Sequence, residues 1–159
     1  MIRPLAVTLI TVLALGMSCA LDTPPVAANP EKHPVKIKVD KVKKKTLIPP
    51  VTVERGEQIE FTAESGRVEI IIPDGRFEFV EPLPQDYTVK NTWVHFVLTP
   101  GETATISVPT DYPEIPDPKH PDKDLEITIW YLVICGSGAD AYTGEDTSPP
   151  RMIIPPKKR

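Results

Sequence analysis

Proline is the feature that most constrains what this chain can fold into. There are 20 prolines among 159 residues, and they recur at short intervals along most of the length. A proline inside a helix costs about 3 kcal/mol, because it removes a backbone donor and collides with the preceding turn. No segment shows a sustained helical period. The sequence therefore predicts a fold without long helices, with prolines at strand borders such as Pro49, Pro73, Pro100 and Pro109.

Between the prolines, apolar and polar residues alternate as they do in half-buried strands. Alternation of this kind runs through 35–39, 59–63, 68–72 and 104–108, and 152–154 closes the series. Two further segments, 93–98 and 129–135, are almost continuously apolar, so 129–135 is expected to be a central strand covered on both faces. The pattern predicts an all-β protein, an antiparallel Greek-key β-sandwich of about seven to eight strands.

The amino terminus has the composition of an export signal, assigned to residues 1–20. Arg3 supplies a positive charge, and 5–17 is an uncharged apolar run, shorter than the about 20 residues that span a bilayer. Two processing routes stay open. A signal peptidase would cut after Ala20, or Cys19 would become the lipidated first residue of a bacterial lipoprotein, since 15–19 is similar to a lipobox.

The remaining chain divides into a proline-rich tether at 21–34, a sandwich domain at 35–156 and a basic tail at 157–159. Removing residues 1–20 takes away one charge, Arg3, and changes the net charge from −4 to −5. That balance gives no general attraction to nucleic acid. After either processing route Cys135 is the only free cysteine, so no intramolecular disulfide can form. We expect Cys135 to be a small core residue.

Three segments resemble parts of the cupredoxins. Residues 51–61 are similar to the opening strands of that family, 99–108 to a later turn and strand, and 131–135 with 151–155 to its final strand pair. The resemblance covers roughly 35–156 and implies a cupredoxin-like sandwich.

The copper ligands of that family are incomplete here. A blue-copper site needs two histidines and a cysteine, with a weak axial ligand that is usually methionine. Cys135 occupies the cysteine position, but the loop after it contains no histidine, and Met152 lies 17 residues beyond. The early position, around Arg67 and Val68, also lacks one. We predict no metal and no other cofactor; the candidates for a rearranged site are Cys135, His95 and His120.

The histidines allow few other interpretations. His95 alternates with Trp93 and Val97, so it shares their face and is expected to be structural. A nucleophile–base pair of His95 with Cys135 would require hydrogen-bond contact. His33 and His120 each precede a proline and are expected in solvated loops.

Two kinds of charge cluster stand out. The long connection 109–124 lacks the glycine that calcium loops use, so its carboxylates are expected to be solvated; they are Asp111, Glu114, Asp117, Asp122 and Asp124. A weaker cation candidate is formed by Asp140, Glu145 and Asp146. A basic cluster is expected to guard an edge strand, with a polyanionic partner as the alternative; it contains Lys36, Lys38, Lys41, Lys43, Lys44 and Lys45.

No constellation of catalytic residues emerges from these patterns. The sequence therefore favours a non-enzymatic binding or structural module of the cell envelope or periplasm, with a protein or small-molecule partner and no nucleic acid. A lipid anchor at Cys19 would hold it to a membrane, and cleavage after Ala20 would release it. The alternatives are a periplasmic metal-handling or electron-transfer protein with a non-standard site, and an unrecognised hydrolase.

Overall fold

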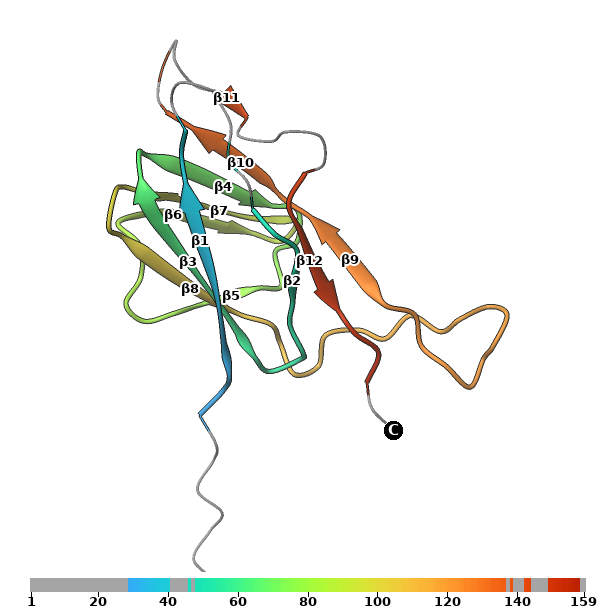
Figure 1. Ribbon diagram of the computed structural model, residues 1–159. Coiled ribbons are helices and arrows are strands. Elements are labelled where there is room, and N and C mark those ends of the chain that lie inside the picture. Colours follow the sequence, from blue (N-terminus) through green and yellow to red (C-terminus); the bar gives the residue numbers. More distant parts are fainter. Residues whose placement is uncertain are drawn as a thin grey trace, which may run out of the picture.

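The computed structural model describes residues 29–40, 46, 48–136, 138, 142–143 and 149–157. Residues 142–143 are described by their backbone only. Strands are the regular elements of this part of the chain (Figure 1). They are β1 (Lys32–Lys38), β2 (Val51–Thr52), β3 (Gln58–Ser65), β4 (Val68–Ile72), β5 (Glu78–Val80), β6 (Asp86–Lys90), β7 (Trp93–Leu98), β8 (Thr103–Ser107), β9 (Ile127–Trp130), β10 (Leu132–Cys135), β11 (Tyr142–Thr143) and β12 (Arg151–Ile154).

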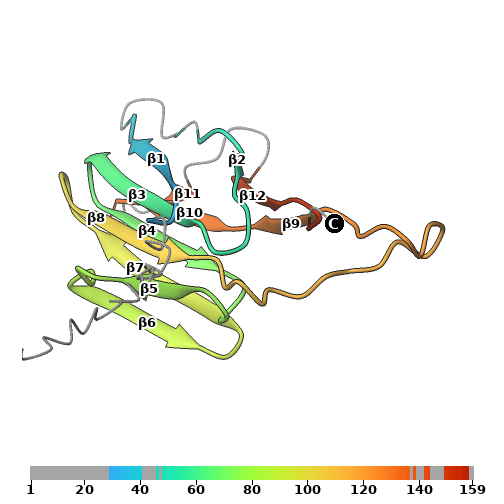
Figure 2. The ribbon, with the colours of Figure 1, turned by 90° about the horizontal axis from the view of Figure 1, so that it is seen from below.

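The strands form three sheets. A four-stranded sheet has the order β1-β3-β8-β5, a five-stranded sheet the order β11-β10-β4-β7-β6, and a small third sheet the order β2-β12-β9. Figures 1 and 2 show the two larger sheets as the layers of a sandwich, with the third sheet beside them. The predicted all-β fold is confirmed at this level.

Two details of the prediction were wrong. Two of the three sheets are mixed, because β1 pairs with β3 and β2 with β12 in parallel, whereas the five-stranded sheet is antiparallel throughout. The described residues also contain twelve strands, more than the about seven to eight predicted. The extra strands are short or exposed: β2 and β11 have two residues each, and four of the five residues of β6 are exposed. Such strands bury too little to leave an alternating pattern.

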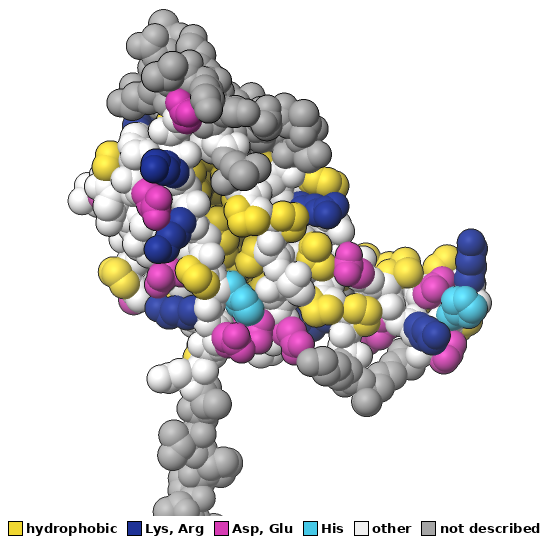
Figure 3. All heavy atoms as spheres, viewed as in Figure 1, with side chains coloured by type: hydrophobic (Ala, Val, Ile, Leu, Met, Phe, Trp, Pro, Cys, Tyr) yellow, Lys and Arg dark blue, Asp and Glu magenta, His cyan; other side chains and the backbone are white. Residues whose placement is uncertain are grey.

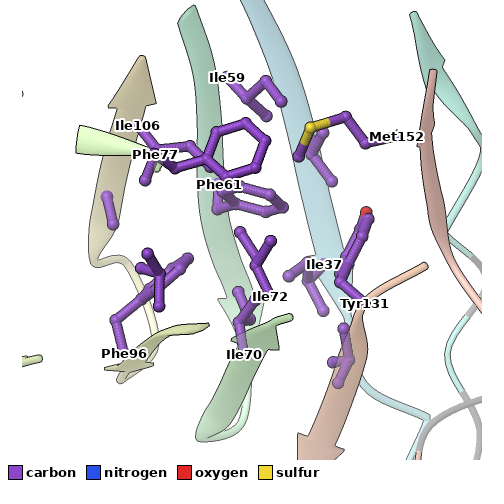
Figure 4. Packing of buried hydrophobic residues seen from close by; sticks show 14 of the residues in the cluster. Ile37, Ile59, Phe61, Ile70, Ile72, Phe77, Phe96, Ile106, Tyr131 and Met152 are labelled. Atoms are coloured by element: carbon purple, nitrogen blue, oxygen red, sulfur yellow. The ribbon is translucent and has the colours of Figure 1, made fainter. Parts of the chain in front are cut away.

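The core lies between the two large sheets and is made by the inward residues of the alternating strands. Ile59, Phe61 and Ala63 of β3 face it from one side, and Ile70 and Ile72 of β4 from the other. The rings of Phe61, Phe96 and Tyr131 meet edge to face, with Phe61 centroids 5.5 Å from Phe96 and 5.7 Å from Tyr131. Figure 4 shows these side chains together with Met152 from the third sheet. One continuous apolar core therefore joins all three sheets.

Segment 129–135 differs from its prediction in an instructive way. It does not form a single strand buried on both faces, because it divides into β9 and β10 at Tyr131. Its side chains alternate instead: Ile129, Tyr131, Val133 and Cys135 are buried, whereas Trp130 keeps 44% of its surface exposed. The continuous apolar run therefore corresponds to strands with one buried and one outward face, and the outward side chains form an apolar surface.

The predicted domain boundaries can be compared with the structure at two places, the tether and the tail. β1 begins at Lys32, inside the segment assigned to the tether, and His33 and Pro34 belong to it. Pro34 is tolerated because β1 is the edge strand of its sheet. The predicted signal 1–20, including Cys19, and most of the tether lie outside the described residues, as do Lys158 and Arg159 of the tail. Within the described residues, no helix is long and apolar enough to cross a membrane.

A long connection between β8 and β9, residues 109–126, leaves the body of the sandwich; we call it the arm. Figures 1 and 2 both show it extending away from the sheets. Its two sides lie close together, since Leu125 N donates to Ile115 O over 2.7 Å and Pro116 forms a bridge with Asp124. The arm is therefore a narrow, ordered hairpin and not an open loop.

Candidate functional site

A shallow apolar hollow lies where β9 passes into β10. At this point Tyr131 N donates to Pro150 O over 3.1 Å, and the Tyr131 ring turns into the core while Trp130 points outward. The hollow has a volume of about 280 Å³ and opens broadly to the surface. Its lining consists of Ile71, Pro73, Trp130, Tyr131, Leu132 and Pro149, and we call it the Trp130 hollow.

The apolar lining follows from strand register. Leu132 of β10 and Ile71 of β4 are directly opposite each other on the outer face of the five-stranded sheet, and each is half-buried. Trp130 comes from the neighbouring third sheet, so the two sheets meet at the hollow. Pro73 and Pro149 close two sides without adding a backbone donor. The hollow is thus held by three separate parts of the chain.

Charged groups flank this hollow without entering it. Arg151 of β12 is the cross-strand neighbour of Trp130, and its guanidinium lies 5.5 Å from the centroid of the indole ring. A cation at this distance from an aromatic face is attracted by about 0.5–1 kcal/mol at an exposed site. Arg151 therefore helps to fix the orientation of the exposed indole.

On another side, the outer face of the five-stranded sheet continues with a polar group. His95 of β7 is directly opposite Ile71, and its Nε2 lies 2.9 Å from Glu69 Oε1. Arg67 Nη1 approaches Glu69 Oε2 at 3.5 Å and donates to Gly136 O over 3.2 Å. These half-buried side chains join β4, β7 and the end of β10. They add a polar margin beside the apolar hollow.

The root of the arm is fastened by one arginine. Arg55 donates through Nε to Tyr112 O over 2.8 Å, through Nη1 to Pro155 O over 2.8 Å and through Nη2 to Pro113 O over 3.0 Å. One planar guanidinium thereby satisfies three carbonyl groups from two distant segments. Arg55 connects the arm to the end of the last strand.

A second cluster holds the same root from the other side. Tyr112 is buried at 3% exposure; its hydroxyl donates to Asp74 Oδ2 and accepts from Arg76 Nη2 over 2.9 Å. Arg76 Nη2 also lies 2.5 Å from Asp74 Oδ2, and the Arg76 guanidinium sits 4.1 Å from the centroid of the Tyr112 ring. Between Asp74 and Arg76, Gly75 packs closely against the end of β6, since a Cβ there would lie 1.8 Å from Lys90 O.

The ionisation of this cluster follows from its contacts. Burial alone would raise the pKa of Asp74, but hydrogen bonds from Arg76 and Tyr112 and the Arg76 charge outweigh it, so the pKa lies below 3.8. Burial and the hydrogen bond to Asp74 raise the pKa of Tyr112 above its ordinary value. At neutral pH the carboxylate and the guanidinium are both charged, and the phenol is neutral.

The structure does not bring together the candidate metal ligands named from the sequence. Cys135 is buried in the core, as predicted, and burial raises the pKa of its thiol, partly opposed by a hydrogen bond with Thr46. His95 lies on the opposite, outer face of the same sheet, beside Trp93 and Val97 as predicted. His120 is exposed near the tip of the arm. No group of three or more His, Cys, Asp or Glu that could hold a metal occurs in the described part of the chain.

His33 was expected in a solvated loop, and this expectation was wrong. His33 is part of β1, is half-buried, and places its Nε2 2.7 Å from Glu57 Oε2. That carboxylate also accepts a hydrogen bond from Glu54 N over 2.7 Å. His33 therefore links the edge strand to the turn that precedes β3.

Three of the five acidic residues of the arm, Asp111, Glu114 and Asp122, are exposed as expected. Asp117 and Asp124 are half-buried instead, and Asp117 Oδ1 accepts a hydrogen bond from Lys119 N over 2.8 Å within the turn. Figure 3 shows acidic, basic and histidine side chains gathered at the arm's far end. The second cation candidate, Asp140 with Glu145 and Asp146, lies outside the described residues.

Two members of the lysine cluster lie on an edge strand, as predicted. Lys36 and Lys38 are exposed on β1, which ends its sheet. Lys36 Nζ lies 4.0 Å from Glu64 Oε1, and Lys32 Nζ lies 3.4 Å from Glu60 Oε2. Figure 3 shows the resulting alternation of basic and acidic side chains along β1. Lys41 and Lys43 to Lys45 lie outside the described residues.

The sequence did not reveal the Trp130 hollow or the Asp74–Arg76–Tyr112 cluster. The only signal for the hollow was a tryptophan between buried positions in 127–135, where alternation would have placed it outward. Asp74 and Tyr112 are 38 residues apart, and their contact depends on how the arm leaves β8.

Comparisons with known proteins add one structural likeness. Among solved structures, the chain is similar to the crystal structure of the periplasmic chaperone SfaE, at 16% identity and a TM-score of 0.36. The aligned part covers 69% of this chain and 54% of that chain, so this chain spans about half of that protein's length. No protein-family model matches the chain, and no curated protein matches it.

Proposed function

We propose that this protein is an exported, non-enzymatic binding module of the cell envelope that captures a protein partner through the Trp130 hollow. The observation that carries the proposal is the exposed Trp130 indole beside Ile71 and Leu132, in a hollow held by three parts of the chain. Tryptophan and arginine are the residues most often found at the energetic centre of protein interfaces. In this protein the Arg151 guanidinium lies over the Trp130 ring.

The shape of the hollow favours a protein over a small molecule. Sites for small ligands are usually clefts of about 300–1,000 Å³ that enclose most of the ligand. This hollow measures about 280 Å³ and is open, so it can receive one apolar side chain but cannot surround a free ligand. A side chain presented by a partner needs no such enclosure, because the surrounding surfaces exclude water.

The margin of the hollow fits the same role. The Glu69–His95 pair on one side and Arg151 on another offer hydrogen-bonding groups around an apolar centre. Interfaces commonly have this arrangement, with a desolvated core and a polar rim. A partner with an exposed leucine, methionine or aromatic side chain and polar neighbours would be complementary.

The binding proposal is tested by substituting Trp130, the proposed hot spot, and Thr128, an exposed residue of the same strand. A photo-crosslinking amino acid at Leu132 identifies the partner in cells, and affinity is then measured with both purified proteins. Trp130→Ala should weaken binding by about 30-fold or more, as expected for a hot-spot tryptophan. Thr128→Ala, on the same strand and exposed but away from the hollow, should change affinity by less than about threefold. Equal binding by Trp130→Ala and the wild type would overturn the proposal.

For the finer architecture, we propose a cupredoxin-like Greek-key sandwich without the copper ligands. The support is the similarity of 51–61, 99–108 and 131–155 to that family, together with the distribution of Cys135, His95 and His120 over three separate places. Titration of the mature protein with Cu(II) should give no thiolate charge-transfer band. An intense band with one equivalent bound would contradict this part of the proposal.

Export and anchoring are proposed from the amino terminus alone. The apolar run 5–17 directs export, and either Cys19 carries lipid or cleavage follows Ala20. Intact-mass analysis of protein from membranes and from the soluble fraction distinguishes the two routes. A diacylglyceryl mass on Cys19 gives a membrane-attached module, and a chain starting at Leu21 gives a free one. Retention of Arg3 in the mature chain would contradict both.

A further inference from the structure

Strand β6 is an edge strand of the five-stranded sheet, and most of its side chains are exposed. It pairs with β7 and with no other strand among the described residues. Figure 2 shows β6 at the margin of the sandwich. Asp86, Tyr87, Val89 and Lys90 are exposed, and the side chains of Asp86 and Lys90 form no hydrogen bond or ion pair within the described part of the chain. The free side of an edge strand carries unpaired backbone donors and acceptors, a template for another strand.

Exposed apolar side chains concentrate at the same place. The described residues include six large hydrophobic side chains that are clearly exposed, and three of them lie within 83–89: Leu83 at 40%, Tyr87 at 41% and Val89 at 45%. Tyr87 and Val89 point to the same face of β6, and the Tyr87 ring lies 5.0 Å from Phe79 of β5. Apolar exposure that is concentrated along an edge indicates an interaction surface.

The sequence of β6 is complementary to itself. We propose that β6 pairs antiparallel with β6 of a second copy, around a twofold axis at Thr88. In this register Asp86 is opposite the partner's Lys90 and Lys90 is opposite the partner's Asp86. Tyr87 meets Val89 in both directions, and Thr88 meets Thr88. Opposite charges, aromatic with β-branched side chains, and threonine pairs are the favourable cross-strand combinations. The twofold axis repeats the charge pair and the tyrosine–valine pair, and the Thr88 pair lies on the axis itself.

Simple protection of the edge explains this pattern less well. A strand guarded against pairing usually carries like charges, as β1 does with its lysines. On β6 one acidic and one basic residue stand at equal distances from Thr88, so two copies attract in the antiparallel register. The two sandwiches would then share one continuous sheet.

The dimer leaves the Trp130 hollow free. The hollow lies on β4 and β10, and β7 separates them from β6 in the sheet. Two hollows per dimer would allow bivalent capture of a repetitive partner, which raises apparent affinity without any new contact. The pairing itself depends on β6 alone and stands independently of the proposed function.

A charge exchange tests the pairing. The mature wild-type chain, examined by sedimentation equilibrium up to about 0.5 mM, should dimerise weakly, because an interface of one short strand is near the lower end of specific contacts. Asp86→Lys places lysine opposite the partner's Lys90, and Lys90→Asp places aspartate opposite the partner's Asp86. Each variant alone should therefore be monomeric, with association weakened at least tenfold. An equimolar mixture should form a heterodimer, because both opposite-charge pairs return.

The controls carry equal charge changes elsewhere. Asp111→Lys on the arm and Lys36→Asp on β1 should dimerise like the wild type. Recovery of association in the mixture also shows that both β6 variants are folded. Three results would each overturn the proposal. They are a wild-type chain that stays monomeric at the highest concentration examined, variants that still dimerise alone, and a mixture that does not associate.

Discussion

Two buried tyrosines in this protein have opposite surroundings. Tyr112 and Tyr131 expose 3% and 2% of their surface. The Tyr112 hydroxyl bonds with Asp74 and Arg76, whereas the Tyr131 hydroxyl has no hydrogen-bond partner among the described residues. A buried polar group without a partner costs about 1–3 kcal/mol. Burial also raises the pKa of Tyr131, which keeps its phenol neutral.

We therefore expect the same substitution to act in opposite directions at these two positions. Tyr131→Phe should raise the free energy of unfolding by about 1 kcal/mol, because it removes an unsatisfied hydroxyl and keeps the ring that packs on Phe61. Tyr112→Phe should lower it by about 1–3 kcal/mol, since Asp74 and Arg76 each lose a partner. Urea unfolding of both variants measures this. Destabilisation by Tyr131→Phe comparable to that by Tyr112→Phe would contradict the expectation.

Asp74 should make stability depend on pH in the acidic range. Its folded-state pKa lies below the ordinary value of 3.8, so its contribution is complete above that value and is lost as the pH falls through the folded-state pKa. Asp74→Asn should lower the free energy of unfolding by about 1–3 kcal/mol at pH 7, as for charged hydrogen bonds. The difference in unfolding free energy between this variant and the wild type should become smaller below about pH 4.

Unfolding curves from pH 7 to pH 2 measure this gap. Asp111→Asn provides the control, because Asp111 is exposed on the arm and should leave the stability profile unchanged. A gap between Asp74→Asn and wild type that stays constant down to pH 2 would show that the Asp74 charge does not contribute.

At the scale of elements, alternation was a reliable guide wherever one face of a strand is buried. The predicted segments 59–63, 68–72 and 93–98 correspond to β3, β4 and β7, because their inward residues fill the core. β5 and β6 escaped prediction, since most of their side chains stay partly or fully exposed and leave no periodic signal. Register and parallel pairing depend on contacts distant in sequence, which alternation alone does not specify.

The arm should be dispensable for folding beyond its root. Arg55 and Tyr112 hold the root to the body, while Ile115 and Leu125 are exposed at 46% and 39%. Because Leu125 N already bonds to Ile115 O, replacing 116–124 with Asn-Gly should close the hairpin through a two-residue turn. The free energy of unfolding should change by less than about 1 kcal/mol, as expected for exposed residues.

Urea unfolding of the shortened protein measures this, and Arg55→Ala is the contrasting variant. Loss of the Arg55 bonds to three carbonyl groups should cost about 1.5–3 kcal/mol. If shortening the arm destabilised the protein more than Arg55→Ala did, the arm would belong to the folded core.

At the scale of the whole molecule, the two outer faces of the sandwich differ in chemistry. The face of β1 and β3 carries Lys–Glu pairs such as Lys32–Glu60, whereas the face of β4 and β10 carries Ile71 and Leu132 beside the Trp130 hollow. The sequence predicted a binding or structural module in general terms but could not place its surface. The hollow exists only because three sequence-distant segments meet, with Trp130 turned outward by the alternation of side chains along 129–135.

The most direct test of the account is a photo-crosslinking scan of both faces in intact cells. The crosslinking amino acid replaces Leu132 or the exposed Pro149 at the hollow, and Lys36 or Thr103 on the outer face of the four-stranded sheet. We expect one discrete adduct with the same partner protein from positions 132 and 149, and none from 36 and 103. Adducts from 36 and 103, with none from 132 and 149, would contradict the central claim that the Trp130 hollow is the binding surface.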